Sequence, residues 1–457
     1  MTGKNQTNDQ DLSRGLTSRH VQMIAIGGAI GTGLFLGSGT AIKSAGPALI
    51  LAYLITGIFS CLMMRAVGEL LLSNTKLHSF IDFVREYLGN KWEFAIGWAY
   101  WLSWASLAMA DLTASGIYLR YWFPQLPQWV TPLIVVAILV TFNLINVAWF
   151  GELESAFSSI KIFAILALIV AGVGMIAFGF HTQGNTASLS NLVSHGGFFA
   201  TGGLGFILAF PMVIFAFTGI EMVGLSAGET KSPEKDIPKA INSVPLRILL
   251  FYVGSMIVIM SVYPWNEIDA STSPFVQVFS GLGISFAANL INFVVLTAAL
   301  SAANSAIFST SRTLYILGNN GHAPKSFSKL SKANVPYVGI LFSAFVFLGI
   351  VLLNYFYPSK IFVLITGVAT ISFIFVWIII MLTHIQYKRK NPNPADTFKM
   401  PFFPGSSYLT ILFYLAVLVV LLFNAETRIS VIATVIFFAA MIIGYIVWER
   451  KNKKELK

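Results

Sequence analysis

Two interruptions inside apolar stretches carry the residues best placed for chemistry in this 457-residue chain. The first is Ile26–Phe35 (IGGAIGTGLF), which holds four glycines within residues 21–41. The second is Phe215–Glu221 (FAFTGIE), within residues 200–228. Each glycine costs a helix interior about 1 kcal/mol relative to alanine. We therefore expect unwound backbone at both places, which membrane proteins tolerate where it lines a cavity or is buried in protein.

The two interruptions would offer complementary hydrogen-bonding groups. A half-helix that starts near Thr32 and Gly33 presents backbone N–H groups and a positive dipole end, which suit a carboxylate. Unwinding at Phe215–Gly219 frees carbonyls that can accept from an ammonium group. Together they predict a site for a zwitterion about the size of an amino acid. Close packing of small residues is the alternative explanation for the first glycines.

Several ionisable residues lie in or beside apolar stretches. Glu221 follows the second interruption directly, and an intramembrane carboxyl is a functional hypothesis by default, with a hydrogen-bonded structural group as the alternative. Lys161 could be an ordinary snorkelling lysine. Asp111 is also intramembrane, but the sequence does not say which way it faces. Arg65 and Glu69 are four residues apart, a spacing at which an ion pair can form.

The composition is that of a membrane protein. Hydrophobic residues make up 56% of the chain and charged residues 11%, against about 25% charged in soluble domains. Apolar runs, each long enough to cross a bilayer core about 30 Å thick, recur at 21–41, 47–72, 94–122, 130–149, 156–180, 200–228, 245–263, 279–306, 337–355, 360–385, 407–424 and 430–449. We predict an all-α integral membrane protein with twelve transmembrane helices. The longest polar connections are 72–91, 228–247, 319–337 and 387–407.

The net charge of +10 follows the predicted topology. With the N-terminus inside, 24 of the 29 Lys and Arg residues fall on the cytoplasmic side, as the positive-inside rule requires. Nucleic acid is therefore not expected as a partner. Both termini are predicted to be cytoplasmic, and a cleavable signal is not expected because the first twenty residues are polar. The histidines show no ligand spacing, so no metal is expected.

Several motifs resemble the amino-acid permeases of the amino acid–polyamine–organocation superfamily. Gly27–Gly39 (GGAIGTGLFLGSG) is similar to the opening motif of that family, and Ser44–Asn74 to its signature across the second span. Further similarities lie in Phe215–Glu229 and in Ser309–Pro324 (STSRTLYILGNNGHAP). Within the family, residues 65–74 and 109–111 look most like bacterial permeases for serine, alanine and glycine, including their D-enantiomers.

The resemblance implies a fold and a division of the chain. The core is a five-plus-five inverted repeat of the LeuT-like kind, with discontinuous helices 1 and 6. The predicted parts are a cytoplasmic N-terminal tail (1–20), the ten-helix transport core (21–385), a cytoplasmic loop (386–406), two additional transmembrane helices (407–449) and a cytoplasmic C-terminal tail (450–457).

It also implies roles for individual residues. The amides of Thr32 and Gly33 match positions that bind the substrate carboxylate. The carbonyls that match those holding the amino group are at Ala29, Phe215, Ala216 and Thr218. Lys161 matches a lysine that stands where sodium-coupled relatives hold an ion, which gives a physical route to proton coupling. Lys161 and Glu221 are the predicted coupling residues.

The predicted function is proton symport of small neutral amino acids (alanine, serine or glycine, L or D) into a bacterial cell across its plasma membrane. The proton gradient is the expected energy source, with no cofactor, and no enzymatic nucleophile–base arrangement is present. The alternatives are a permease for aromatic or other neutral amino acids, and an exchanger or sensor without net proton movement. The oligomeric state is not indicated.

Overall fold

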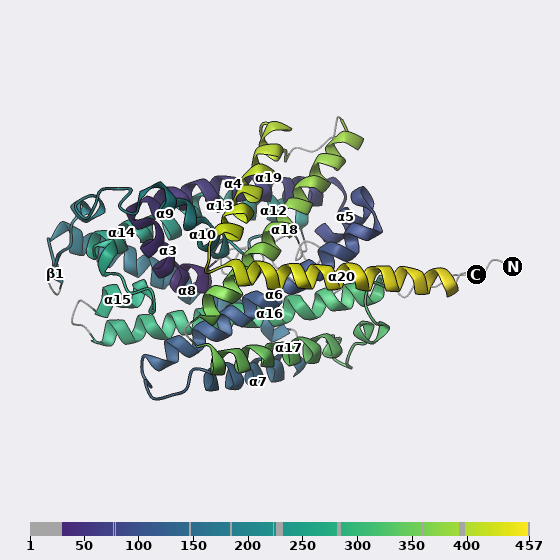
Figure 1. Cartoon of the computed structure of the whole chain (residues 1–457), viewed down its shortest axis with the longest axis horizontal. Coiled ribbons are helices and arrows are strands. Elements are labelled where there is room, and N and C mark those ends of the chain that lie inside the picture. The colour runs from purple at the N-terminus through teal and green to yellow at the C-terminus, as the bar shows by residue number, and fades with distance from the viewer. Residues whose placement is uncertain are drawn as a thin grey trace.

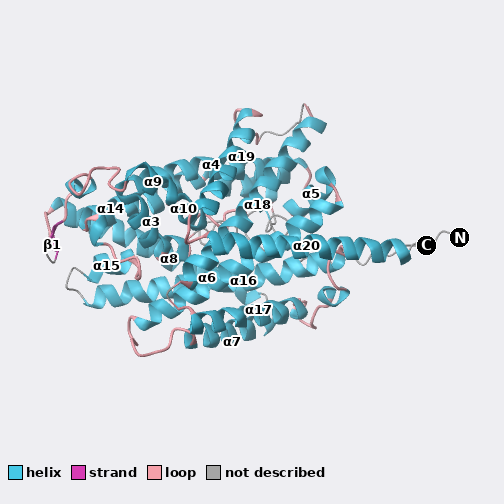
Figure 2. Cartoon of the chain, in the orientation of Figure 1, coloured by secondary structure: helices cyan, strands magenta, loops and turns pink. Residues whose placement is uncertain are grey.

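A computed structural model gives the fold of residues 30–75, 77, 79–145, 148–182, 185–222, 224, 232–280, 285–358, 360–392 and 398–455. The regular structure is dominated by helices that form one elongated bundle (Figures 1 and 2). Two short strands, β1 (His181–Thr182) and β2 (Asn185–Thr186), pair antiparallel. The end of the bundle where α20 finishes is called the tail end below. The opposite end, which carries β1 and α15, is called the loop end (Figure 1).

The α-helices are α2 (Thr32–Phe35), α3 (Gly37–Ala45), α4 (Leu49–Ser73), α5 (Phe80–Leu88), α6 (Asn90–Arg120), α7 (Val130–Ile145), α8 (Ala148–Ala177), α9 (Gly202–Leu208), α10 (Phe210–Ala216), α12 (Pro233–Asn242), α13 (Val244–Arg247), α14 (Ser255–Val262), α15 (Pro274–Ser280), α16 (Ser285–Asn319), α17 (Tyr337–Phe356), α18 (Ile361–Lys390), α19 (Gly405–Phe423) and α20 (Arg428–Glu455). A π-helical segment, Ile248–Gly254, joins α13 to α14.

Every predicted apolar run falls on one or more of these helices. Eight helical stretches of the described chain are long and apolar enough to cross a membrane: Gly37–Ser73, Ala156–Ala177, Pro233–Val262, Phe286–Asn319, Tyr337–Phe356, Ile361–Lys390, Gly405–Phe423 and Arg428–Ile446. This shows an all-α, multi-pass membrane protein. The count of twelve spans and the inverted repeat stay predictions.

Helix α6 runs through the middle of the bundle, where it packs along α16 and crosses α18 (Figure 1). Large aromatic side chains fill this centre, among them the fully buried Trp104 of α6 and Trp377 of α18. The outer helices are apolar toward the outside: Phe163, Phe345 and Ile436 are more than half exposed. An apolar exterior around a core that also holds buried polar groups is what a lipid environment requires.

Two of the predicted polar connections contain helices. In the 72–91 connection, α5 starts with a capping box in which Asp82 Oδ2 accepts from the Ser79 backbone N–H at 3.0 Å. Its apolar face is buried, including Phe80 and Val84. The 228–247 connection contains α12 and α13. An amphipathic helix such as α5 escapes a search for long apolar runs because only one face is hydrophobic.

Candidate substrate site

The first predicted break lies at the start of α2. Gly31 is extended (φ −129°, ψ −161°), and the four-residue helix Thr32–Phe35 begins directly after it. The backbone N–H groups of Leu34 and Phe35 both donate to Gly31 O at 3.2 Å. As the first two residues of the helix, Thr32 and Gly33 have no intrahelical acceptor for their amides. These are the amides assigned to a substrate carboxylate; Ala29 lies outside the described residues.

The second break begins where α10 ends at Ala216 and continues as turns over residues 217–221. Gly219 has φ +91°, a conformation that a side chain would strain. Phe215 O accepts from the Thr218 hydroxyl at 2.7 Å, and Ala216 O accepts from the Tyr252 hydroxyl at 2.8 Å. Phe215 O also accepts from the Thr218 backbone N–H at 3.2 Å, so two of the carbonyls assigned to the substrate ammonium already hold hydrogen bonds.

The two breaks touch each other. A Cβ built on Gly33 would lie 2.6 Å from Ala216 Cα, 3.0 Å from Ala216 N and 3.1 Å from the Phe215 ring. One turn along, a Cβ on Gly37 would lie 2.7 Å from Met212 Sδ. Glycine at position 33 is therefore needed for the backbones to approach this closely. The structure brings Thr32, Gly33, Phe215 and Ala216 into one place.

Asp111 is a further residue of this region. Its side chain, on α6, is fully buried, and Oδ1 accepts from the Thr32 hydroxyl at 2.7 Å. Lys161 of α8 is also fully buried and interacts electrostatically with Asp111. The structure thus links the predicted coupling lysine to the first break through one carboxylate. The sequence marked Asp111 as intramembrane, but its facing depends on the rotation of α6, which a nearly uniformly apolar helix does not reveal.

Glu221 is the last residue of the second break, and its surroundings differ from those of Lys161. Its carboxyl is fully buried, Trp377 Nε1 donates to Oε2 at 3.2 Å, and the Tyr100 hydroxyl interacts with the same carboxyl. Tyr100 and Trp104 stack edge to face, with ring centroids 6.1 Å apart. The two predicted coupling residues therefore occupy separate environments: Lys161 lies beside a carboxylate, and Glu221 lies among neutral aromatic groups.

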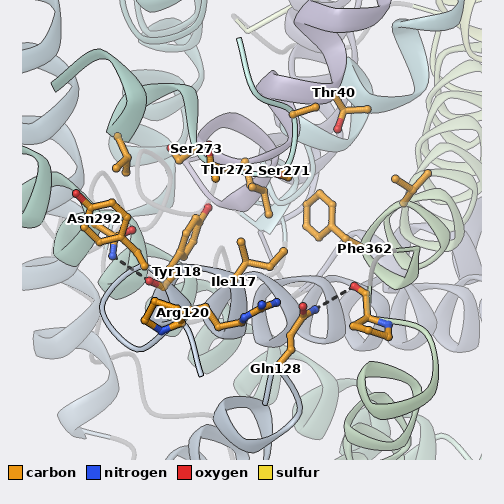
Figure 3. A pocket seen from close by; sticks show the side chains of 17 residues that line it. Thr40, Ile117, Tyr118, Arg120, Gln128, Ser271, Thr272, Ser273, Asn292 and Phe362 are labelled. Atoms are coloured by element: carbon orange, nitrogen blue, oxygen red, sulfur yellow. Dashed lines mark hydrogen bonds between the residues drawn. The ribbon is translucent and has the colours of Figure 1, made fainter. Parts of the chain in front are cut away.

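A cavity of about 530 Å³, whose lining side chains are drawn in Figure 3, lies next to the start of α15 at the loop end. Its walls come from α3, the end of α6, the segment before α7, the start of α15, and α16 and α18. The Phe362 ring lines the cavity and meets the Phe215 ring edge to face, with centroids 6.3 Å apart. The cavity wall therefore contacts the second break through this pair of aromatic rings.

Comparison with known proteins agrees with this architecture. The chain matches the amino acid permease family over residues 20–457. It is 56% identical over 447 residues to the amino-acid permease AapA of Bacillus subtilis (strain 168), covering 97% of each chain. It is 46% identical over 454 residues to the D-serine/D-alanine/glycine transporter of Escherichia coli (strain K12), covering 98% of this chain and 97% of the relative. A probable threonine/serine transporter of Bacillus subtilis, YbxG, is 46% identical over 443 residues, covering 96% of each chain. The chain belongs to the amino acid permease family and is a transporter, not an enzyme.

Proposed function

We propose that this permease imports small neutral amino acids into the bacterial cell together with protons. The contact between the two breaks, at Gly33 and Ala216, carries the proposal. It brings the backbone of Gly33 against that of Ala216, which supports a site built from the amides of Thr32 and Gly33 and the carbonyls of the segment from Phe215 to Thr218. Donors on one side and acceptors on the other match the carboxylate and the ammonium of an α-amino acid.

The small side chains at the contact favour a small substrate. Gly33 and Ala216 add almost no volume, while the rings of Phe215 and Phe362 meet above them. Two of the relatives are named for serine, threonine, alanine or glycine. Alanine, serine and glycine are therefore the proposed substrates, in either enantiomer.

Coupling is assigned to Lys161 and Glu221. Lys161 interacts electrostatically with Asp111, and Asp111 Oδ1 accepts a hydrogen bond from the Thr32 hydroxyl at the first break. When Lys161 gains or loses a proton, the charge that faces Asp111 changes. The hydrogen bond between Asp111 and the Thr32 hydroxyl transmits this change to the Thr32 and Gly33 amides that are proposed to bind the substrate. Glu221 stands directly after the second break, where a change of protonation would alter the bond from Trp377. Neither step requires a cofactor.

The orientation follows from charge. Basic residues gather at the tail end, including Lys388, Arg389 and Lys390 at the end of α18. We assign this end to the cytoplasm by the positive-inside rule. The loop end, with the 530 Å³ cavity, then faces the outside.

The purified protein in vesicles tests the proposal. Labelled alanine or serine should accumulate when an inward proton gradient is imposed, and a protonophore should abolish the accumulation. Uphill uptake that persists without a proton gradient would overturn symport, and counterflow without a proton requirement would indicate exchange. Competition by a panel of amino acids fixes the substrate; stronger competition by aromatic than by small amino acids would overturn the assigned class.

Lys161→Ala tests the coupling residue. We expect the variant to keep amino-acid exchange and to lose concentrative uptake, because the substrate amides remain while the titrating group is gone. Lys332→Ala is the matched control, since Lys332 is exposed and is not among the residues that line the cavity described above. Unchanged proton-driven accumulation in Lys161→Ala would remove Lys161 from the mechanism.

A further inference from the structure

We propose that the cavity at the loop end is a capture site for the carboxylate group of amino acids, with Arg120 as its anion-binding group. The inference rests on the proposed function and adds a second place where substrate binds before it reaches the breaks. The cavity volume of about 530 Å³ lies within the range of about 300–1,000 Å³ that is typical of small-molecule sites.

Arg120 is the charged residue among those that line the cavity. Its guanidinium has no hydrogen-bond or ion-pair partner in the part of the chain that the structure describes. A guanidinium presents five donors in a planar fork that fits a carboxylate bidentately. An unpaired arginine at the wall of a cavity is therefore an open position for an anionic group.

The other polar side chains divide into those that hold the wall and those that face it. Gln128 Nε2 donates to Asn354 Oδ1 at 2.8 Å and to Pro358 O at 3.2 Å, and Asn292 Nδ2 donates to Tyr118 O at 2.9 Å. These side-chain amides make hydrogen bonds that join the elements of the cavity wall. Figure 3 shows Arg120 and Gln128 on one side of the cavity and the hydroxyl residues 271–273 on the other.

The wall that carries Arg120 is fixed in place. A Cβ on Gly116, one turn before Arg120, would lie 2.7 Å from Gln128 O, so the segment before α7 is packed directly on the backbone of α6. On the same helix, Tyr118 lines the cavity and interacts electrostatically with Asp111, which holds Thr32. One helix thus runs from the capture site to the first break.

The positive charge of Arg120 also sorts ligands by charge. It attracts zwitterions through their carboxylate and repels cationic amino acids, and both effects weaken as salt screens the charge. Arg120 is thereby a specificity-determining residue: it favours neutral and acidic amino acids over basic ones before the central site is reached.

Uptake kinetics of labelled alanine in vesicles test the capture site. In Arg120→Gln we expect KM to rise about three- to tenfold with kcat unchanged within about twofold, because the charge of an exposed arginine contributes modestly. Arg120→Lys should recover part of the loss. Arg428→Gln, which removes an exposed arginine at the start of α20 away from the cavity, is the control and should match the wild type. Added salt should raise KM in the wild type and leave it unchanged in Arg120→Gln.

A second pair of variants keeps Arg120 in place. Thr272 lines the cavity and is exposed, so Thr272→Glu supplies an internal anion that competes for Arg120, whereas Thr272→Gln has the same size without charge. KM should rise in Thr272→Glu alone. A KM unchanged in both Arg120→Gln and Thr272→Glu, with wild-type uptake intact, would overturn the capture site and leave the proposed function standing. Wild-type vesicles that take up no amino acid would overturn both.

Discussion

Two glutamates with fully buried side chains occupy opposite chemical situations in this permease. Glu69, near the tail end of α4, receives the Lys388 ammonium at 2.6 Å, His384 Nε2 at 2.9 Å and the backbone N–H of Met400 at 2.7 Å. Glu221, at the second break, receives the Trp377 indole at 3.2 Å and lies beside Tyr100. Both carboxyls are equally removed from solvent. What differs is the charge of the groups around them.

The difference separates a carboxylate that is compensated by a cation from one that meets only neutral groups. Glu69 is compensated by a lysine and held by three donors that come from α18 and from the segment before α19, so it clamps three parts of the tail end together. A buried charge that is paired and fully hydrogen-bonded is costly to disturb. Glu221 meets neutral donors and stands on turn backbone. Solvent exposure alone would not distinguish Glu69 from Glu221, because both side chains are fully buried.

The largest expected effect is on stability, at Glu69. Glu69→Gln leaves Lys388 and His384 facing a neutral amide, and breaking a buried pair in this way costs about 3–5 kcal/mol. We expect a marked fall in the Tm of the detergent-purified protein, with transport per folded molecule retained. Glu426→Gln, at an exposed acid between α19 and α20, is the control. A Tm equal to that of the control would show that the cluster is not a clamp.

Next in size is the loss of transport at the contact between the breaks. In Gly33→Ala the added Cβ would lie 2.6 Å from Ala216 Cα, so the two breaks must move apart. We expect uptake to fall at least about 100-fold, which corresponds to about 2.7 kcal/mol, in protein that still purifies as a folded species. The matched control is Gly174→Ala, because a Cβ at Gly174 has nothing within 4 Å. Equal uptake by the two variants would contradict the proposed site.

The sequence pointed to both segments because glycine and turn residues inside an apolar run are a local signal. The structure begins α2 at Thr32 and ends α10 at Ala216, within the predicted segments. The contact between Gly33 and Ala216 was not readable, since it joins residues far apart in the chain and depends on how two helices pack. The facing of Asp111 stayed open in the sequence for the same reason.

Local spacing also misled at the tail end. Arg65 and Glu69 are four residues apart on α4, yet each bonds elsewhere: Arg65 to Asn242 and Lys399, and Glu69 to the α18 cluster. Their partners lie more than 170 residues away in sequence. A spacing of four reports only that two side chains share a helix face. It does not show whether the two side chains bond to each other or to donors and acceptors on other helices.

Glu221→Gln probes the functional side of the comparison. If Glu221 carries a proton during transport, the amide fixes a neutral state, and proton-driven accumulation should fall about tenfold, or about 1.4 kcal/mol, while counterflow continues. The Tm should change far less than in Glu69→Gln, because no cationic partner interacts with Glu221 in the described structure. The accumulation ratio under an imposed pH gradient is the measurement, again with Glu426→Gln as control. A Tm loss as large as that of Glu69→Gln would make Glu221 a structural residue too.

The smallest expected effect is at Arg65, beside the clamp. Its guanidinium donates to Asn242 Oδ1 at 2.8 Å and to Lys399 O at 3.1 Å, and it lies 3.8 Å from the centroid of the Phe398 ring. A lysine cannot reproduce the fork and the stacking together, so Arg65→Lys should cost about 1 kcal/mol of stability. Arg389→Lys is the control, since Arg389 makes one exposed bond to Tyr408.

The size of the Arg65→Lys effect tells where the tail end draws its stability. Arg65 and Glu69 both bind the segment 398–400, one through a backbone carbonyl and one through a backbone N–H. If Arg65→Lys lowers the Tm much less than Glu69→Gln, the compensated carboxylate is the main clamp and the arginine only positions the segment. Equal losses of Tm in the two variants would mean that docking of the segment 398–400, rather than burial of a paired charge, stabilises the tail end. The contrast between Glu69 and Glu221 would then rest on geometry instead of charge.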